Sequence, residues 1–141
     1  MRNTLMDFTL RKYKELLTCL LENGYKFITF EQYCAQKLAS SPNSLIASSP
    51  YIILRHDVDL KAANSLATAQ IEQALGIKAS YYFRVVAESN QPDIIRSIAE
   101  LGHEVGYHYE DMAIADGDVQ KAYAHFQKQL QYFRSFYPVR T

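Results

Sequence analysis

The stretch "YIILRHDVDL", residues 51–60, ends an apolar run in a dense set of titratable side chains. Side chains of an extended strand alternate between its two faces, so Asp57 and Asp59 point one way while His56 and Val58 point the other. Burying charged groups is unfavourable by several kcal/mol unless they are paired or bind a metal. Two carboxylates on one face at the end of an apolar strand therefore indicate a binding or catalytic role.

A second cluster, "YHYED" at residues 107–111, also places titratable side chains at the end of a predicted strand. By the same alternation His108 and Glu110 share a face, opposite Tyr107 and Tyr109. Carboxylate oxygens and an imidazole nitrogen are the usual ligands of Zn²⁺, Mn²⁺ or Fe²⁺, and a catalytic site keeps one position open for water. A bound metal lowers the pKa of that water toward about 7, and a carboxylate outside the coordination shell can act as general base.

Simpler interpretations exist for each charged residue taken alone. An isolated HxD pattern is more often a surface or helix-capping feature, and Arg55 and Arg84 are explained by pairing with neighbouring carboxylates. His103 follows a helix-ending glycine and is expected to cap that helix or to support a metal ligand. His125 lies on the polar face of the last helix, where we expect it to be solvated. Two clusters at equivalent strand ends nevertheless favour a functional interpretation.

The elements that must position these clusters follow from periodicity and from turn residues. Four strands are expected, at residues 25–30, 51–60, 77–86 and 103–111. Helices are expected at residues 10–23, before Gly24, at 60–76, at 91–102 with Pro92 at the start, and at 118–133, with a weaker one at 31–40. Residues 40–50, rich in Ser, Pro and Asn, are expected to form a surface loop. The apolar stripe of the helix at 60–76 runs through Ala63, Leu66, Ala67, Ala74 and Leu75.

Strands that alternate with helices predict an α/β fold of about four parallel strands with outer helices, joined by right-handed crossovers. Parallel sheets place functional groups at the carboxyl ends of their strands, and both clusters follow strands there. If the strands are neighbours in a barrel-like sheet, the two clusters share one rim. The length of 141 residues predicts a single domain, residues 1–141.

The composition argues against several classes of function. Fifteen basic residues balance fifteen acidic ones without a basic run, so a nucleic-acid partner is not expected. No apolar run approaches the roughly 20 residues that cross a bilayer, and the N-terminus does not have the pattern of a signal peptide. Cys19 and Cys34 lack metal-site spacing, and we expect both to be buried thiols. A cytoplasmic location with no membrane partner is therefore expected.

The motifs "YIILRHDVD", "ASYYFRV" and "GHEVGYHYE" follow one another, with an alanine-rich helix after the first. This order resembles the polysaccharide deacetylase superfamily, the proteins with a NodB-homology domain, and more closely its "RHDVD" branch. The resemblance implies a distorted (β/α) barrel with a metal site on its rim. It also implies hydrolysis of an N-acetyl group, or of another C–N amide bond that is not a peptide bond, by metal-activated water. The substrate would be an N-acetylated carbohydrate or a related amide.

Carried onto this chain, the resemblance makes Asp57 the catalytic base and Asp59 a metal ligand. One residue separates this pair, which is commonly adjacent in the family, so either aspartate remains a candidate for the base. His108 matches the first of two metal-binding histidines, and Met112 stands four residues further on, where the family has the second. We infer that Glu110 replaces it, because Glu110 shares a strand face with His108. The expected ion is divalent, most simply Zn²⁺, with Mn²⁺, Co²⁺ or Fe²⁺ as alternatives.

Later motifs of the superfamily, which include an arginine that orients the base and a histidine that acts as general acid, cannot be placed before Thr141. About four strands do not close a barrel that takes about eight. The expectation is a partial (β/α) barrel, the N-terminal part of a deacetylase-like domain truncated after the second motif. An oligomer or a partner chain would then complete the barrel.

Two alternatives to an amidohydrolase remain. In the first alternative, the chain is a catalytically inactive barrel fragment that serves as a binding or assembly module, and the missing second histidine supports this interpretation. Otherwise it is a structural protein that needs no metal, in which case Asp57→Ala and Asp59→Ala would leave stability unchanged or raise it by relieving like-charge repulsion.

Overall fold

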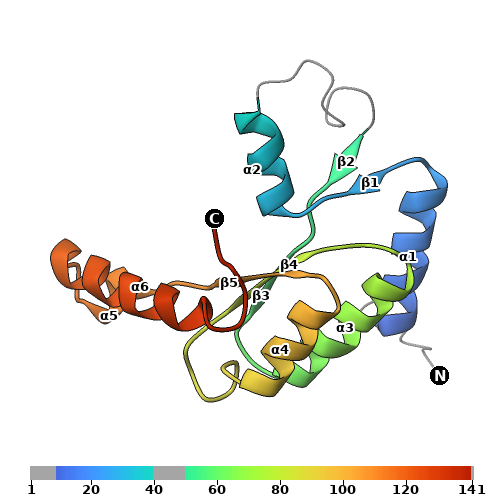
Figure 1. Ribbon diagram of the computed structural model, residues 1–141. Helices are drawn as coiled ribbons and strands as arrows, with labels where there is room; N and C mark the ends of the chain where they lie inside the picture. The colour runs from blue at the N-terminus through green and yellow to red at the C-terminus, as the bar shows by residue number, and fades with distance from the viewer. Residues whose placement is uncertain (1–8, 40–49, 141) are drawn as a thin grey trace.

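The computed structural model describes residues 9–39 and 50–140 (Figure 1). The elements of this part of the chain, in order, are α1 (Leu10–Glu22), β1 (Lys26–Phe27), α2 (Phe30–Leu38), β2 (Tyr51–Ile52), β3 (Arg55–Val58), α3 (Ala62–Ala74), β4 (Ser80–Phe83), α4 (Pro92–Glu100), β5 (Glu104–Tyr107), α5 (Asp111–Ile114) and α6 (Val119–Phe133). The predicted α/β class is confirmed. The loop predicted at residues 40–50 falls, apart from its last residue, outside the described residues.

The starts of α1, α2 and α6 are fixed by side chains that accept otherwise unpaired backbone N–H groups. Thr9 accepts a hydrogen bond from the Lys12 N–H at the start of α1. Thr29 and Gln32 form a reciprocal capping box at the start of α2, which gives this short helix a defined first turn. Asp118 caps α6 in the same way as Thr9 caps α1. The helices therefore begin within a few residues of the predicted positions.

All strand pairs of the described chain are parallel: β1 pairs with β2, and β4 lies between β3 and β5. The predicted strand at 51–60 is divided, because β2 pairs with β1 while β3 pairs with β4. The segment between β2 and β3 still runs beside β4, because the Leu54 carbonyl accepts a hydrogen bond of 2.9 Å from the Ser80 N–H. Parallel strands with helical crossovers agree with the prediction. The described residues form no closed barrel.

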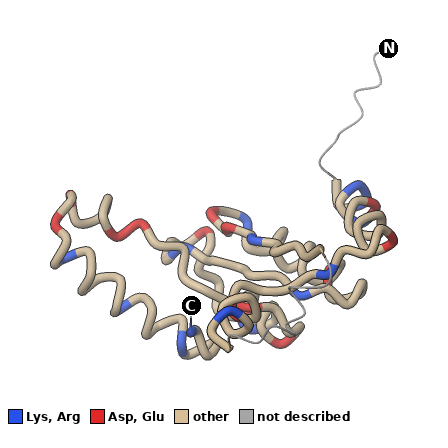
Figure 2. The backbone as a smooth tube through the Cα atoms, turned by 90° about the horizontal axis from the view of Figure 1, so that it is seen from above, with Lys and Arg blue, Asp and Glu red and all other residues tan. Residues whose placement is uncertain are grey.

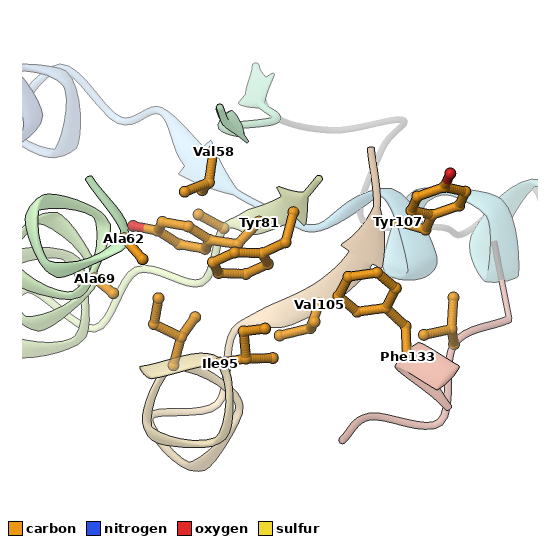
Figure 3. Close-up of a cluster of buried hydrophobic side chains, with 12 residues drawn as sticks. Val58, Ala62, Ala69, Tyr81, Ile95, Val105, Tyr107 and Phe133 are labelled. Carbon is orange, nitrogen blue, oxygen red and sulfur yellow. The ribbon is translucent and has the colours of Figure 1, made fainter. Parts of the chain in front are cut away.

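One face of the sheet β3-β4-β5 carries the hydrophobic core (Figure 3). Strand alternation directs Val58, Tyr81, Phe83, Val105 and Tyr107 to this face, and all five side chains are buried. They pack against residues of α3, α4 and α6, namely Ala62, Ala69, Ile95, Ile98 and Phe133. Figure 1 shows α3 and α4 together beside the three strands. Each large apolar side chain buried here contributes roughly 1.5–3 kcal/mol to folding.

The opposite face is polar and is arranged in levels by the strand register. The lowest level contains Arg55, Ser80 and Glu104, and the next contains Asp57, Tyr82 and Gly106. By alternation, the level above contains Asp59, Arg84 and His108. Helix α2 covers the lowest level, where the Phe30 N–H donates to Ser80 Oγ and the Glu31 N–H donates to Glu104 Oε2. The upper levels stay partly exposed, so the face opens toward the carboxyl ends of the strands.

Gly106 allows the Tyr82 ring to lie across β5. A Cβ atom at position 106 would be only 2.5 Å from Tyr82 Cε1, closer than atoms can approach. The Arg55 guanidinium lies over the same ring, 4.6 Å from its centre. The Tyr82 ring therefore fills the space over Gly106 and contacts Arg55 of the lowest level, so the middle level is packed beneath Asp59, Arg84 and His108.

Several expectations about single residues were wrong. Cys19 is exposed and Cys34 is half-buried, although both were expected to be buried. His103 neither caps a helix nor reaches the polar face, because it is buried between the Ala79 N–H and the Ala69 carbonyl. Burial lowers the pKa of its imidazole. His125 is not simply solvated, because its Nδ1 contacts Asp111 Oδ1.

Basic and acidic residues are interspersed along the described part of the chain (Figure 2). Among the described helices, none has the length and apolar character needed to cross a membrane.

Candidate metal centre

Asp59 and His108 meet at the carboxyl ends of β3 and β5. Each is the first residue after its strand, and the His108 N–H donates a hydrogen bond of 2.9 Å to the Phe83 carbonyl at the end of β4. His108 Nδ1 lies 3.1 Å from Asp59 Oδ1. The geometry between these atoms is not that of a hydrogen bond, and Nδ1 is buried without a hydrogen-bond partner. A buried nitrogen left unsatisfied in this way is unusual.

This separation suits two ligands of one ion. Neighbouring ligand atoms that are each about 2.1 Å from one ion lie about 3.0 Å apart in octahedral coordination and about 3.4 Å apart in tetrahedral coordination. Asp59 Oδ1 and His108 Nδ1 lie at 3.1 Å, and a shared cation would satisfy both atoms at once. The Asp59 side chain is 55% exposed and that of His108 is 22% exposed, so the pair lies at the solvent edge of the polar face although the Nδ1 atom itself is buried. This donor pair fits part of the shell of a divalent ion.

Glu110 does not complete the shell, because Arg84 holds it. Arg84 Nε and Nη2 donate to Glu110 Oε2 at 2.9 Å and 2.5 Å. Arg84 Nε also lies 3.9 Å from Asp59 Oδ1, so one guanidinium stands between two of the three expected ligands. The structure brings Asp59 and His108 together but leaves Glu110 on the arginine. Met112, where the motif resemblance led us to look for a second metal-binding histidine, is 50% exposed on α5.

Asp57 lies one level below Asp59, on the same face, as the alternation predicts. Arg55 Nε donates a hydrogen bond of 2.8 Å to Asp57 Oδ1. Because both side chains are about two-fifths exposed, this ion pair orients Asp57 more than it stabilises the fold. The expectation that Arg55 and Arg84 pair with neighbouring carboxylates is confirmed, and both pairs lie within the candidate site.

His56 of the "RHDVD" motif belongs to the other face of the sheet. Its Nε2 lies 2.7 Å from Glu72 Oε1 of α3, and its ring stacks on Tyr81 with the ring centres 4.4 Å apart. This arrangement confirms the prediction that His56 points away from the two aspartates. The motif therefore serves both faces of the sheet: its histidine lies on the helix-covered face, and its aspartates lie on the polar face.

In the described parts of the chain, no three His, Cys, Asp or Glu side chains are grouped closely enough to hold one ion. The expected set of Asp59, His108 and Glu110 is thus represented by two residues in contact and a third that is paired with Arg84.

Sequence reasoning did not assign a place in the site to Tyr82 or Gly106, or a bridging position to Arg84. Strand alternation could have located all three, because Ser80, Tyr82 and Arg84 follow one another at a spacing of two along "SYYFR". It could not have shown that Arg84 would reach Glu110, because this contact joins different strands.

Comparison with known proteins gave no significant match to a family model, a curated protein or a solved structure.

Proposed function

We propose that this protein is a metal-dependent hydrolase of non-peptide C–N amide bonds, and that it removes acetyl groups from an N-acetylated carbohydrate. The observation that carries the proposal is the contact between Asp59 Oδ1 and the otherwise unsatisfied His108 Nδ1. A carboxylate and an imidazole held about 3 Å apart at the end of a parallel sheet form a partial ligand set for Zn²⁺ or a similar ion. The motif resemblance supplies the reaction class.

The roles of the residues follow from their contacts. Asp59 and His108 would hold the ion, most simply Zn²⁺. The ion would supply Lewis acidity, which activates water for attack on an amide carbonyl. Arg55 holds Asp57 Oδ1, which leaves Asp57 Oδ2 as the atom that accepts the proton of the attacking water. The Tyr82 ring packs against the Arg55 guanidinium and so helps to hold that arginine in place beside Asp57.

Three further expectations from the sequence remain proposals. The sheet would be part of a (β/α) barrel of the deacetylase type, and a partner chain or a second copy would complete that barrel. Parallel sheets are normally covered on both faces, whereas Asp57 and Asp59 are exposed here. The location would be cytoplasmic. Size-exclusion chromatography with light scattering tests the second proposal, and cell fractionation tests the third.

The enzymatic proposal is tested by loading the whole chain with Zn²⁺ and measuring acetate release from tetraacetylchitotetraose. We expect release that falls by at least about 100-fold in Asp57→Asn, because a positioned general base contributes about 10²–10⁴-fold to such reactions. His108→Ala should lose both the ion and the activity. Absence of acetate release from a chain that holds one equivalent of Zn²⁺ would overturn the proposal for this substrate class.

A catalytically inactive binding or assembly module is the second candidate, and one observation favours it. Arg84 already provides positive charge to Glu110 and stands 3.9 Å from Asp59, so the rim carboxylates are partly neutralised without an ion. This candidate predicts that the folded chain binds chitooligosaccharides without hydrolysing them and takes up Zn²⁺ in less than stoichiometric amount. The two candidates therefore differ in metal content as well as in acetate release.

A further inference from the structure

Ser89 lies in the loop between β4 and α4 and is fully buried, although its side chain is polar. A buried hydroxyl group needs hydrogen-bond partners, because its transfer out of water is otherwise unfavourable. Ser89 Oγ accepts a hydrogen bond of 3.2 Å from the Arg84 N–H and donates a hydrogen bond to the Val58 carbonyl. Its partners are therefore backbone groups at the ends of two different strands.

The loop holds Ser89 in place through its own turn and through α6. The N–H groups of Ser89 and Asn90 both donate to the Val86 carbonyl, at 3.1 Å and 2.7 Å. The Asn90 side chain in turn accepts a hydrogen bond of 2.8 Å from the Tyr132 hydroxyl of α6. Because the turn is hydrogen-bonded both internally and to a helix, the Ser89 hydroxyl meets the strands from a defined position.

The two backbone groups that Ser89 binds stand where Asp59 and Arg84 leave the sheet. The Val58 carbonyl belongs to the peptide group that leads into Asp59. The Arg84 N–H belongs to the peptide group that follows Phe83. Val58 and Phe83 are register partners at the ends of β3 and β4, and the Val58 side chain is anchored in the core (Figure 3). The serine hydroxyl therefore ties the two strand ends together at the rim.

A series of hydrogen bonds continues from Ser89 to His108. The peptide group whose N–H binds Ser89 Oγ also carries the Phe83 carbonyl, which accepts a hydrogen bond of 2.9 Å from the His108 N–H. Hydrogen bonds in series polarise and strengthen one another. The series thus links the peptide group before Asp59 to the backbone of His108, and the Ser89 hydroxyl is its side-chain member.

This link bears on the candidate metal centre because the strand ends set the positions of its two ligands. Asp59 Oδ1 lies 3.1 Å from His108 Nδ1 and 3.9 Å from Arg84 Nε. The Asp59 side chain is 55% exposed, so its position depends mainly on its backbone. A binding geometry is lost when its groups move by more than about 0.5 Å, and a small shift of the end of β3 would therefore separate the two ligands.

We propose that Ser89 is a positioning residue of the candidate metal centre, whose hydroxyl group fixes the backbone before Asp59 so that Oδ1 faces His108 Nδ1. This inference rests on the proposed function, because it gives Ser89 a role toward the same ion. Ser89 acts through the Val58 carbonyl and the Arg84 N–H rather than as a ligand. Replacing groups that orient metal ligands typically lowers metal affinity by about 10–100-fold.

The first test measures the Zn²⁺ affinity of the whole chain by calorimetry. Ser89→Ala should weaken Zn²⁺ binding by at least about tenfold, because the end of β3 is no longer held. Ser80→Ala is the matched control, since Ser80 is also fully buried and its Oγ hydrogen-bonds the Phe30 N–H and Glu104 at the opposite end of β4. Both variants should lose stability in chemical denaturation, but Ser80→Ala should keep its Zn²⁺ affinity within about twofold.

A second pair of variants separates the hydroxyl group from packing and serves if Ser89→Ala does not fold. Threonine and valine have nearly the same shape, and only threonine keeps the hydroxyl. We expect Ser89→Thr to bind Zn²⁺ about tenfold more tightly than Ser89→Val. Equal affinities of these two variants would overturn the inference, as would equal losses of affinity in Ser89→Ala and Ser80→Ala, because Ser89 would then serve only packing or general stability.

NMR of the metal-free chain distinguishes this inference from the proposed function. Ser89→Ala should shift the ring signals of His108 without any ion, whereas Ser80→Ala should leave them unchanged. If the unaltered chain binds no Zn²⁺ but Ser89→Ala shifts the His108 signals, the metal-dependent function is refuted and the positioning role of Ser89 is supported. If the unaltered chain binds Zn²⁺ but the His108 signals of metal-free Ser89→Ala are unchanged, the inference is overturned and the metal site stands.

Discussion

Two clusters of titratable side chains lie on opposite faces of the same three-stranded sheet, and they are built differently. On the helix-covered face, Glu72 of α3 is fully buried. It accepts hydrogen bonds from the hydroxyls of Tyr13 and Tyr81, and His56 lies 2.7 Å away. On the polar face, Asp59 is more than half exposed and lies beside His108 Nδ1 without a hydrogen bond between them.

The difference separates a structural carboxylate from one that is available to a ligand. Burial raises the pKa of Glu72, but the hydrogen bond and the electrostatic attraction of His56, with hydrogen bonds from Tyr13 and Tyr81, outweigh burial and hold that pKa below its ordinary value. Burial and contact with Glu72 also raise the pKa of both tyrosine hydroxyls. A buried network that is satisfied throughout fixes the position of α1 and α3 against the sheet. In the pair of Asp59 and His108, the Nδ1 atom of His108 has no hydrogen-bond partner and so remains available to bind a metal ion.

The largest expected effect on the free energy of unfolding comes from the buried cluster around Glu72. Glu72→Gln should lower the free energy of unfolding by about 3 kcal/mol at pH 7, because it removes a charge that three groups bind and leaves buried donors poorly matched. Chemical denaturation measures this change. Glu100→Gln on α4, which replaces an exposed carboxylate, is the control and should change stability by less than about 0.5 kcal/mol. Equal effects of the two substitutions would contradict the structural role of Glu72.

The same carboxylate predicts a pH dependence. Its pKa in the folded protein lies below its ordinary value of 4.5, so its contribution to stability is complete above that value and is lost as the pH falls through the folded pKa. The acid limb of a stability profile should therefore be flatter in Glu72→Gln than in the unaltered chain. An unchanged acid limb would show that Glu72 does not contribute in this way.

A smaller effect is expected for Gly106→Ala on the polar face. The added methyl group would lie 2.5 Å from Tyr82 Cε1, and the ring would have to move away from β5, at a loss of about 1–3 kcal/mol in unfolding free energy. In a double-mutant cycle, Tyr82→Ala should remove most of this loss, because the clash then has no partner. Additive effects would indicate that the two residues do not touch.

The smallest effect is expected at Arg84, and it should appear in metal affinity rather than in stability. Arg84→Met should change the unfolding free energy by less than about 1 kcal/mol, since its partner Glu110 is substantially exposed. Removing a positive charge near Asp59 should raise Zn²⁺ affinity by about tenfold, since like charges several Å apart repel by about 1 kcal/mol even in water. Arg96→Met on α4 is the control, because Arg96 pairs with the exposed Asp93 and lies over Phe136, away from the rim. Weaker Zn²⁺ binding in Arg84→Met would show that Arg84 supports the site instead of competing with the ion.

The alternation of strand residues made much of the site predictable. Asp57 and Asp59 share a face, His56 faces the core, and Tyr107 is buried opposite His108, as a period of two requires. Parallel pairing then brought the two motif ends to one rim. These features depend on backbone geometry that is the same in every strand.

Features that depend on contacts between elements were not predictable in the same way. The stripe predicted on α3 ran through Ala63, Leu66, Ala67, Ala74 and Leu75. Leu66 packs against the core, but the fully buried residues are Ala62, Ala69 and Glu72. Apolar patterning missed this face because its largest member is a carboxylate, which is buried only because α1, β3 and β4 supply donors. In the same way, Glu110 shares a strand face with His108 in the pattern, but the chain turns into α5 at Glu110 and Arg84 binds its carboxylate.

The most direct test of the account is a calorimetric titration of the metal-free chain with Zn²⁺, with NMR detection of the His108 ring. We predict one equivalent of bound ion, a shift of the His108 signals on binding, and a loss of at least about 100-fold in affinity for both His108→Ala and Asp59→Asn. Glu31→Gln, which alters a half-buried carboxylate at the opposite end of the polar face, should keep the affinity of the unaltered chain. Zn²⁺ binding that persists unchanged in His108→Ala, or its absence from the correctly folded unaltered chain, would contradict the assignment of the rim pair as a metal site.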